Sequence, residues 1–261
     1  MLPISADTFP KTADELATAL RGGFDSKGLA LRAISAEGGY PQLTKLSIDL
    51  TGTEVSRENR LGAVTGEKSD PVEIGHFALF GEPVYFEKTA LEARLEADAV
   101  KLVTTGEPKN GSLVLESAKD GSVSVKAEIE ALEGLLLSFA AEAAKKQGIE
   151  IKKTKLTLTQ EGPRAVAFRA EVTAKVFIMS ATLALTGRLE IDDEFNARLS
   201  SLALDGDAMV MNLAGSFLKP RLQQLEGKVF PLFAFLPGGI KLRDIQVSVT
   251  SALQVQARFG E

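Results

Sequence analysis

Few residues of this chain could carry catalytic chemistry. His76 is the only histidine, and the sequence contains no cysteine. A hydrolase of the Ser-His-Asp type would therefore have to use His76 as its base. The Gly-x-Ser-x-Gly turn that presents the nucleophile in many hydrolases does not occur in the sequence. The simpler interpretation of His76 is a strand residue with an ordinary hydrogen bond, and hydrolysis through His76 is kept as an alternative function.

Three other segments have residue types found in ligand sites, but not the required spacing. Residues 62–69 contain glycines, a lysine and a serine, yet Glu67 interrupts the pattern of a phosphate-binding loop and no apolar strand leads into it. The acidic residues of 192–194 and 205–207 lack the alternating spacing of a calcium loop, and turns explain them. The sequence therefore predicts no metal and no cofactor.

Composition narrows the classes of partner and compartment. The 30 basic and 35 acidic residues give a net charge of -5, which does not favour nucleic acid as a partner. No basic segment followed by a long apolar run is seen at the N-terminus, and the longest uncharged stretch, residues 229–240, is broken by prolines and glycines. We expect a cytoplasmic or peripheral membrane protein, or a periplasmic or cell-envelope protein if a leader has been removed.

Three segments have the periodicity of helices. A capping box at residues 12–15 precedes a short amphipathic helix that we expect to stop at Gly22-Gly23. Residues 131–147 form a second helix, because their apolar residues recur at spacings of three and four before a glycine. A third helix is expected from residue 207 towards Val229, with a kink at Pro220.

Most of the remaining chain alternates as strands do. The front half is mostly strand, with a long loop over residues 51–71. From residue 166 to 176 the even positions are apolar, whereas after Met179 the odd positions are. A single straight strand over residues 166–191 would be longer than about 80 Å. A bulge, a sharp bend or a tight hairpin must therefore lie between residues 176 and 179. Residues 242–259 form a bent strand or a hairpin, and the fold class is α+β.

Large adaptable side chains gather in and around the predicted helices. Phenylalanine and methionine can repack around a flexible ligand, although apolar stripes at helical spacing also form ordinary cores. Residues 230–237 contain three phenylalanines and two leucines within a segment broken by prolines. This segment could be a loop beneath a sheet or an apolar tip that enters a membrane, because large exposed apolar patches usually mark interfaces. Both alternatives remain open on the residues alone.

The order of elements over residues 84–260 resembles bacterial LmeA-like phospholipid-binding proteins, whose fold is similar to that of the tubular lipid-binding superfamily. The resemblance rests on the helix at 132–147 followed by long strands, and on the segments 187–193 and 204–207. The Pro-kinked helix, the segment 236–242 and a last strand that ends in Phe-Gly complete it. These segments cover about two thirds of the chain.

The resemblance implies one lipid-binding domain over residues 1–261, with residues 1–83 as its N-terminal helix and strands. A long, strongly curved antiparallel sheet would wrap around a long Pro-kinked helix and a second helix and leave an elongated apolar cavity. The family has no catalytic residues to transfer, so the expected function is non-enzymatic binding or transfer of phospholipid or another acyl-chain lipid, with transient contact to a membrane surface. A structural or protein-interaction module with a filled core is the other alternative.

The expected site residues follow from the apolar stripes of these elements. The lipid-binding residues are Leu132, Leu135, Leu136, Phe139, Ala143, Phe168, Val172, Val176, Met179, Leu183, Met211, Leu213, Phe217, Leu218, Leu222 and Leu225. The membrane-contact residues are Phe230, Phe233, Phe235 and Leu236.

Overall fold

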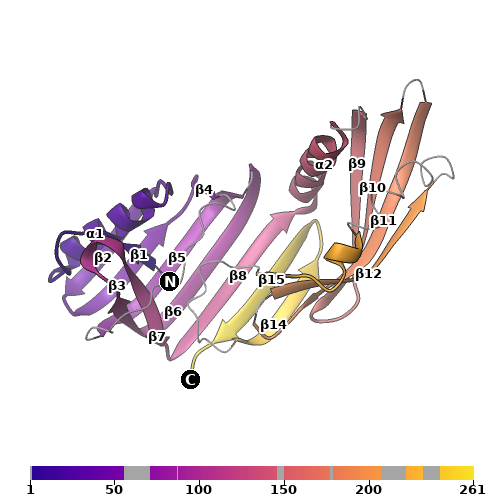
Figure 1. The fold of residues 1–261 in the computed structure, drawn as a ribbon. Helices are drawn as coiled ribbons and strands as arrows, with labels where there is room; N and C mark the ends of the chain where they lie inside the picture. Colours follow the sequence, from indigo (N-terminus) through magenta and orange to yellow (C-terminus); the bar gives the residue numbers. More distant parts are fainter. Residues whose placement is uncertain are drawn as a thin grey trace. The chain divides into compact units, whose positions relative to one another are not determined.

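The structure is a computed structural model with an α+β fold made mostly of sheet (Figure 1). It describes residues 2–55, 71–86, 88–145, 150–176, 179–194, 196–206, 222–231 and 242–261. They divide into two compact units, one of residues 2–126, 242–244 and 256–261, and one of 127–231 and 245–255, within those described ranges. Neither sheet closes on itself among these residues. The prediction of one lipid-binding domain stays a prediction.

The first unit is built on most of a ten-stranded sheet in the order β14-β15-β8-β6-β5-β3-β2. The strands of this path are β2 (Ala33–Gly39), β3 (Gln42–Asp49), β5 (Val72–Phe86), β6 (Thr89–Thr105), β8 (Asp120–Glu128), β14 (Leu242–Val249) and β15 (Ala252–Phe259). Off this path lie β1 (Leu2–Ile4), β4 (Glu54–Val55) and β7 (Gly111–Ser117), with a short 3₁₀ turn at Pro108–Asn110 before β7. The division between the units passes through β8, β14 and β15.

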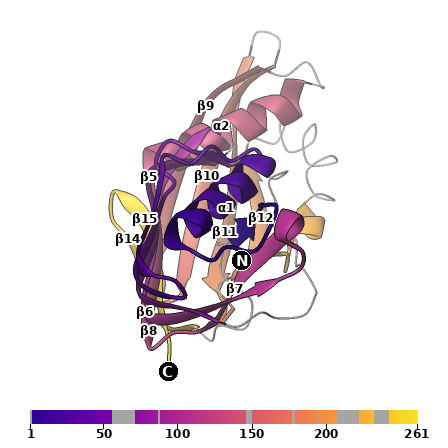
Figure 2. The same cartoon turned by 90° about the vertical axis from the view of Figure 1, so that its left-hand side faces the viewer.

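Helix α1 (Ala13–Ser26) lies against one face of this sheet (Figure 2). The predicted cap at Thr12 is confirmed, because its hydroxyl accepts a hydrogen bond from Glu15 N at 3.1 Å. The Glu15 carboxylate, however, accepts from Lys11 N at 2.7 Å. The expected stop at Gly22-Gly23 is wrong. A Cβ at Gly23 would lie 2.2 Å from the carbonyl oxygen of Pro3, so this glycine lets α1 approach β1 rather than ending the helix.

The core of the first unit contains large side chains that are almost completely removed from solvent. Those with less than 2 % exposure include Phe24, Phe259, Ile4, Leu16, Leu20, Leu29, Leu46, Ile48, Leu50, Ile74 and Leu79. They come from α1, from the strands and from the connections between them. Since burial of one such side chain contributes about 1.5–3 kcal/mol, this core is the main source of stability in the first unit.

The second unit contains a five-stranded antiparallel sheet in the order β13-β12-β11-β10-β9. Its strands are β9 (Glu150–Gln160), β10 (Ala165–Val176), β11 (Met179–Ile191), β12 (Asn196–Gly206) and β13 (Val229–Pro231). Val176 pairs with Met179, so the phase change in the sequence marks a tight hairpin. Even positions of β10 pair with odd positions of β11, and both apolar sets therefore share one face.

The remaining predicted elements have mixed outcomes. The second helix is confirmed as α2 (Ile129–Lys145), and the C-terminal segment is the strand pair β14 and β15. Residues 222–225 are helical, whereas the rest of the predicted third helix up to residue 221, with its kink at Pro220, lies outside the described residues. The expected end towards Val229 is wrong, because Gly227 has a φ of 72° and Val229 begins β13. Most of the predicted loop at 51–71 also lies outside the described residues.

Candidate functional site

The five-stranded sheet of the second unit has one apolar face. Phe168 in β10 pairs with Leu158 in β9 and with Gly187 in β11. Residues that pair directly in antiparallel strands point to the same side of a sheet. The same face continues from Leu185 in β11 to Leu204 in β12. The apolar face is formed by Leu156, Leu158, Val166, Phe168, Ala170, Val172, Leu183, Leu185, Leu189, Ile191, Ala197, Leu199, Leu202 and Leu204.

This apolar face is only partly covered. One of its fully buried residues, Ala170, is small, and the others, Val166, Ile191 and Ala197, lie at one end of the strands. Its leucines, together with Phe168 and Val172, are all half-buried. A core side chain would normally lose nearly all of its contact with water. The face therefore offers apolar area that a ligand could still cover.

A β-bulge in β12 shapes the middle of the face. Ser201 and Leu202 together lie opposite the single residue Gly187, and Ser201 has a φ of 54°, in the left-handed region. A Cβ at Gly187 would lie 2.6 Å from both Phe168 Cζ and Leu202 Cδ2. The phenylalanine ring and the leucine side chain thus meet above the glycine backbone. The extra residue also keeps Leu199 and Leu202 on the same face although they are three residues apart.

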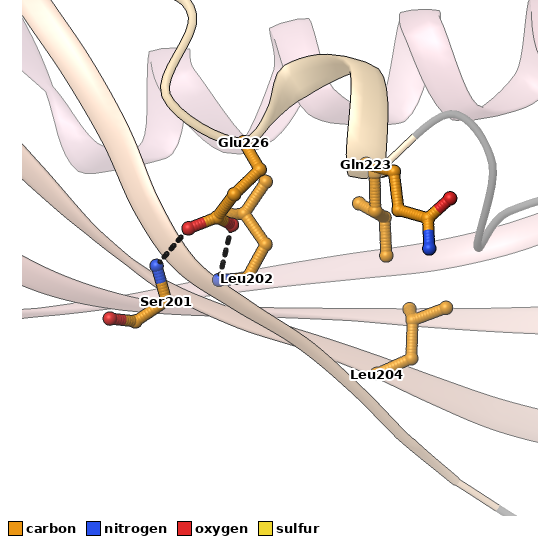
Figure 3. Close-up of a pocket in the computed structure, with 6 residues that line it drawn as sticks. Ser201, Leu202, Leu204, Gln223 and Glu226 are labelled. Atoms are coloured by element: carbon orange, nitrogen blue, oxygen red, sulfur yellow. Dashed lines mark hydrogen bonds between the residues drawn. The ribbon is translucent and has the colours of Figure 1, made fainter.

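Glu226 holds the chain that follows residues 222–225 against this bulge. Its carboxylate accepts hydrogen bonds from Ser201 N at 2.8 Å and from Leu202 N at 2.9 Å (Figure 3). Both are charge-assisted bonds when the carboxylate is ionised. Gly227 N donates in turn to Leu199 O at 2.7 Å. The helical turn at 222–225 is therefore anchored beside the apolar face.

A pocket of about 400 Å³ lies between β12 and this helical turn (Figure 3). Three leucines and three polar residues line it: Leu202, Leu204, Leu222, Ser201, Gln223 and Glu226. The volume is at the low end of the roughly 300–1,000 Å³ of small-molecule sites. A pocket of this volume has room for a small ligand or for one part of a larger ligand.

Helix α2 lies along the outer edge of the same sheet. The Glu133 carboxylate accepts a hydrogen bond from Leu156 N at 2.7 Å, and Thr154 donates its hydroxyl to Glu133 O at 3.0 Å. The first bond satisfies a backbone N–H group that the edge strand β9 would otherwise expose, and the second joins a β9 side chain to the backbone of α2. The three predicted leucines of α2, Leu132, Leu135 and Leu136, are half-buried. That they share one interior with Phe168 stays a prediction.

The other predicted site residues fall into three groups. Phe168, Val172 and Leu183 lie on the apolar face, Leu222 lines the pocket and Leu225 is half-buried in the same helical turn. The backbones of Phe139, Ala143, Val176, Met179 and Phe230 lie in α2, β10, β11 and β13, but their side chains are outside what the structure describes. Met211, Leu213, Phe217, Leu218, Phe233, Phe235 and Leu236 lie outside the described residues altogether.

Five of the six pocket residues are not among those predicted from the sequence. Leu202 and Leu204 carry a signal that was available, because the apolar positions change from odd to even between Leu199 and Leu202. Such a change within one strand indicates a bulge. The polar lining of Ser201, Gln223 and Glu226 has no comparable signal, since it depends on the return of the chain from residue 222 to β12.

His76 lies on the surface of the first unit. Its Nδ1 is 2.8 Å from an Asp98 carboxylate oxygen on the neighbouring strand, and the two side chains are 44 % and 65 % exposed. This geometry agrees with the interpretation of His76 as a strand residue with an ordinary hydrogen bond. Within the described ranges, no group of three or more acidic, histidine or cysteine side chains could hold a metal ion. None of the helices in those ranges is long and apolar enough to cross a membrane.

No family model, no curated protein and no solved structure matches the chain. The resemblance to LmeA-like proteins therefore stays an expectation. Function has to be inferred from the residues of the apolar face and the pocket.

Proposed function

We propose that this protein binds an acyl-chain lipid without catalysis, on the apolar face of the five-stranded sheet. The resemblance to LmeA-like proteins makes phospholipid the first class to consider. The observation that carries the proposal is the half-burial of Phe168 and of every leucine of this face. Those side chains would gain stability from a further apolar cover, and an acyl chain is a cover of the right chemistry.

The free energy available is sufficient for useful affinity. Each buried CH₂ contributes about 0.8 kcal/mol, so a chain of sixteen carbons could gain roughly 10 kcal/mol before ordering costs are subtracted. Binding of this kind needs no charged anchor. Large exposed apolar patches usually mark interaction sites, and a ligand on this face would cover its half-buried leucines.

The finer architecture is part of the proposal. In it the sheet is long and strongly curved and wraps a Pro-kinked helix, whose stripe would include Met211, Leu213, Phe217 and Leu218. These four residues would extend the apolar cover from Leu222 along the channel. Residues 207–221 lie outside the described part of the chain, so the support for the proposal comes from the sheet face and the helical turn at 222–225.

Lipid retention tests the proposal directly. Native mass spectrometry of gently purified protein should show bound lipid, and Val172→Trp should reduce it by filling volume above the sheet. Thr173→Trp is the matched control, because Thr173 is the next residue of β10 and points to the opposite face. The control should keep its lipid.

Two results would contradict lipid binding. One is a clean apo mass for the wild-type protein after mild handling, which would favour the structural module with a filled core. The other is an unchanged lipid load in Val172→Trp together with a stability loss of about 1–3 kcal/mol, the usual cost of overpacking a core.

Membrane contact forms the second part of the proposal. Phe233 and Phe235, with Phe230 and Leu236, would form an apolar lip through which an acyl chain leaves a bilayer without crossing water. Lys228, Lys241 and Arg243 flank this segment in the sequence and could meet anionic headgroups, each contributing about 1 kcal/mol. Phe233→Asp combined with Phe235→Asp should abolish liposome flotation and leave the fold intact. Unfolding of this double variant would instead place both residues in a core.

A further inference from the structure

The pocket at β12 has an apolar wall and a polar end of one charge sign. Leu202, Leu204 and Leu222 form the wall, and Glu226 supplies a carboxylate. None of the described residues that line the pocket is basic. Lys228 lies two residues beyond Glu226 and is exposed, but it is not part of the lining. The local chemistry is therefore that of a hydrogen-bond acceptor beside hydrocarbon.

The carboxylate of Glu226 is held in place and keeps free acceptor capacity. Two carboxylate oxygens offer about four lone-pair positions. Ser201 N and Leu202 N use two of them, at 2.8 and 2.9 Å. Because the bulge fixes both N–H groups, the carboxylate pays little further ordering cost when a ligand donates to it. The remaining positions are available to a hydroxyl group.

A phosphate group would fit this pocket poorly. Its negative charge would approach the Glu226 carboxylate, and none of the described residues that line the pocket is basic. Because Glu226 is exposed, this repulsion is moderate and is weakened by salt. A fully ionised phosphate also has no hydrogen-bond donor to offer the Glu226 carboxylate. A neutral headgroup with hydroxyl donors avoids both problems, and the amide of Gln223 can pair with its oxygens.

Building on the proposed lipid binding, we propose that this pocket receives the hydroxyl-bearing headgroup of a neutral glycerolipid. Glu226 accepts a hydrogen bond from the headgroup, and Gln223 contributes a second polar contact. The acyl chain then leaves the pocket past Leu202 and Leu204 and continues over Phe168 on the apolar face. The pocket thus discriminates against anionic phospholipids that the apolar face alone would accept.

Two lipids that differ by one phosphate test this selectivity. Monopalmitoylglycerol and its phosphate ester, lysophosphatidic acid, should be compared by displacement of a fluorescent fatty-acyl probe from the full-length, delipidated protein. The wild-type protein should bind the neutral lipid about tenfold more tightly, the factor that a modest loss of electrostatic complementarity produces. Equal affinity, or a preference for the phosphate ester, would overturn the assignment of the pocket and leave lipid binding intact.

Variants at the polar end of the pocket show whether the pocket or the rest of the apolar face discriminates between the two lipids. Glu226→Gln should bring the two affinities close together, because the charge is removed and one acceptor oxygen remains. Glu190→Gln is the matched control, since Glu190 lies in the same sheet on the opposite face and should not change the ratio. If the ratio of the two affinities is unchanged in Glu226→Gln, the Glu226 carboxylate does not contact the headgroup.

A second variant keeps the test valid if Glu226→Gln disturbs the bulge. Gln223→Lys leaves both hydrogen bonds of Glu226 in place and adds a positive charge to the exposed rim of the pocket. It should raise the affinity for lysophosphatidic acid and leave that for monopalmitoylglycerol nearly unchanged. No change in either affinity would place the headgroup elsewhere. Failure of the wild-type protein to bind the acyl probe at all would refute lipid binding itself.

Discussion

The two compact units bury their apolar residues differently. Most of the largest fully buried side chains of the described residues belong to the first unit, and Leu46 in β3 is typical of them, with 0 % exposure. Ile191, with 1 % exposure, is an example in the second unit. Among the described residues of the second unit, alanines make up much of the buried set, while leucines such as Leu185 remain half-buried. The first unit therefore buries most of its large apolar side chains by its own packing. In the described part of the second unit, more of the large apolar side chains keep contact with water.

The largest predicted effect comes from the same substitution made in both units. Leu46→Ala should lower the free energy of unfolding by about 2–5 kcal/mol, because it opens a cavity in a closed core. Leu185→Ala should cost only about 1 kcal/mol in delipidated protein, because this side chain loses only part of its contact with water on folding. Urea denaturation of the two variants measures the difference. Equal losses would mean that the second unit has an ordinary core.

A smaller contrast is expected from two glycines. In Gly23→Ala the new Cβ would lie 2.2 Å from Pro3 O, which is backbone, so the variant should lose about 1–3 kcal/mol. In Gly187→Ala it would meet the ends of the Phe168 and Leu202 side chains, both at 2.6 Å. Those half-buried side chains can move, and a loss of about 0.5 kcal/mol is expected.

Thermal unfolding of the two glycine variants tests this contrast. Alanine is favoured over glycine within a helix by about 1 kcal/mol. A stabilised Gly23→Ala variant would therefore show that α1 can move away from β1 at little cost. A severe loss in Gly187→Ala would show that the apolar face is packed as rigidly as the first unit.

Local sequence patterns predicted the parts of the fold that depend on local periodicity. The phase change after Val176 pointed to a hairpin as one of three possibilities, and the antiparallel pairing shows the hairpin. Thr12 was identified as a cap because capping needs only neighbouring residues. The stop at Gly22-Gly23 was wrong because Gly23 allows a close contact with β1 and Gly22 one with Ser5, and both lie far outside a helical window.

The candidate site was harder to predict for the same physical reason. Phe168, Val172 and Leu183 were found because one strand pair places them on one face. The pocket depends on a bulge at Ser201 and on Glu226, which is 25 residues further along the chain. No periodicity links a carboxylate to the backbone groups that it caps. Such a contact can be recognised only once the strands are paired.

The smallest predicted effect concerns charge at the edge of the second unit. It tests whether surface ion pairs contribute to the stability of this unit, whose apolar face is only partly buried. Glu150 and Lys152 form a hydrogen-bonded ion pair at the start of β9, and both are exposed. The hydrogen bond and charge of Lys152, with a smaller contribution from Lys175, hold the pKa of Glu150 below its ordinary value of 4.5. A carboxyl whose pKa is lowered on folding stabilises the folded state above that ordinary value, and the contribution disappears as the pH falls through the folded pKa.

Lys152→Ala should therefore raise the pKa of Glu150 towards 4.5, which an NMR titration would measure. The free energy of unfolding at neutral pH should change little, because exposed ion pairs contribute little to stability. Lys153→Ala is the matched control and should leave this pKa where it is. A large loss of stability in Lys152→Ala, with none in Lys153→Ala, would show that charges stabilise the edge of β9. The half-burial of the apolar face would then no longer indicate that a ligand covers it.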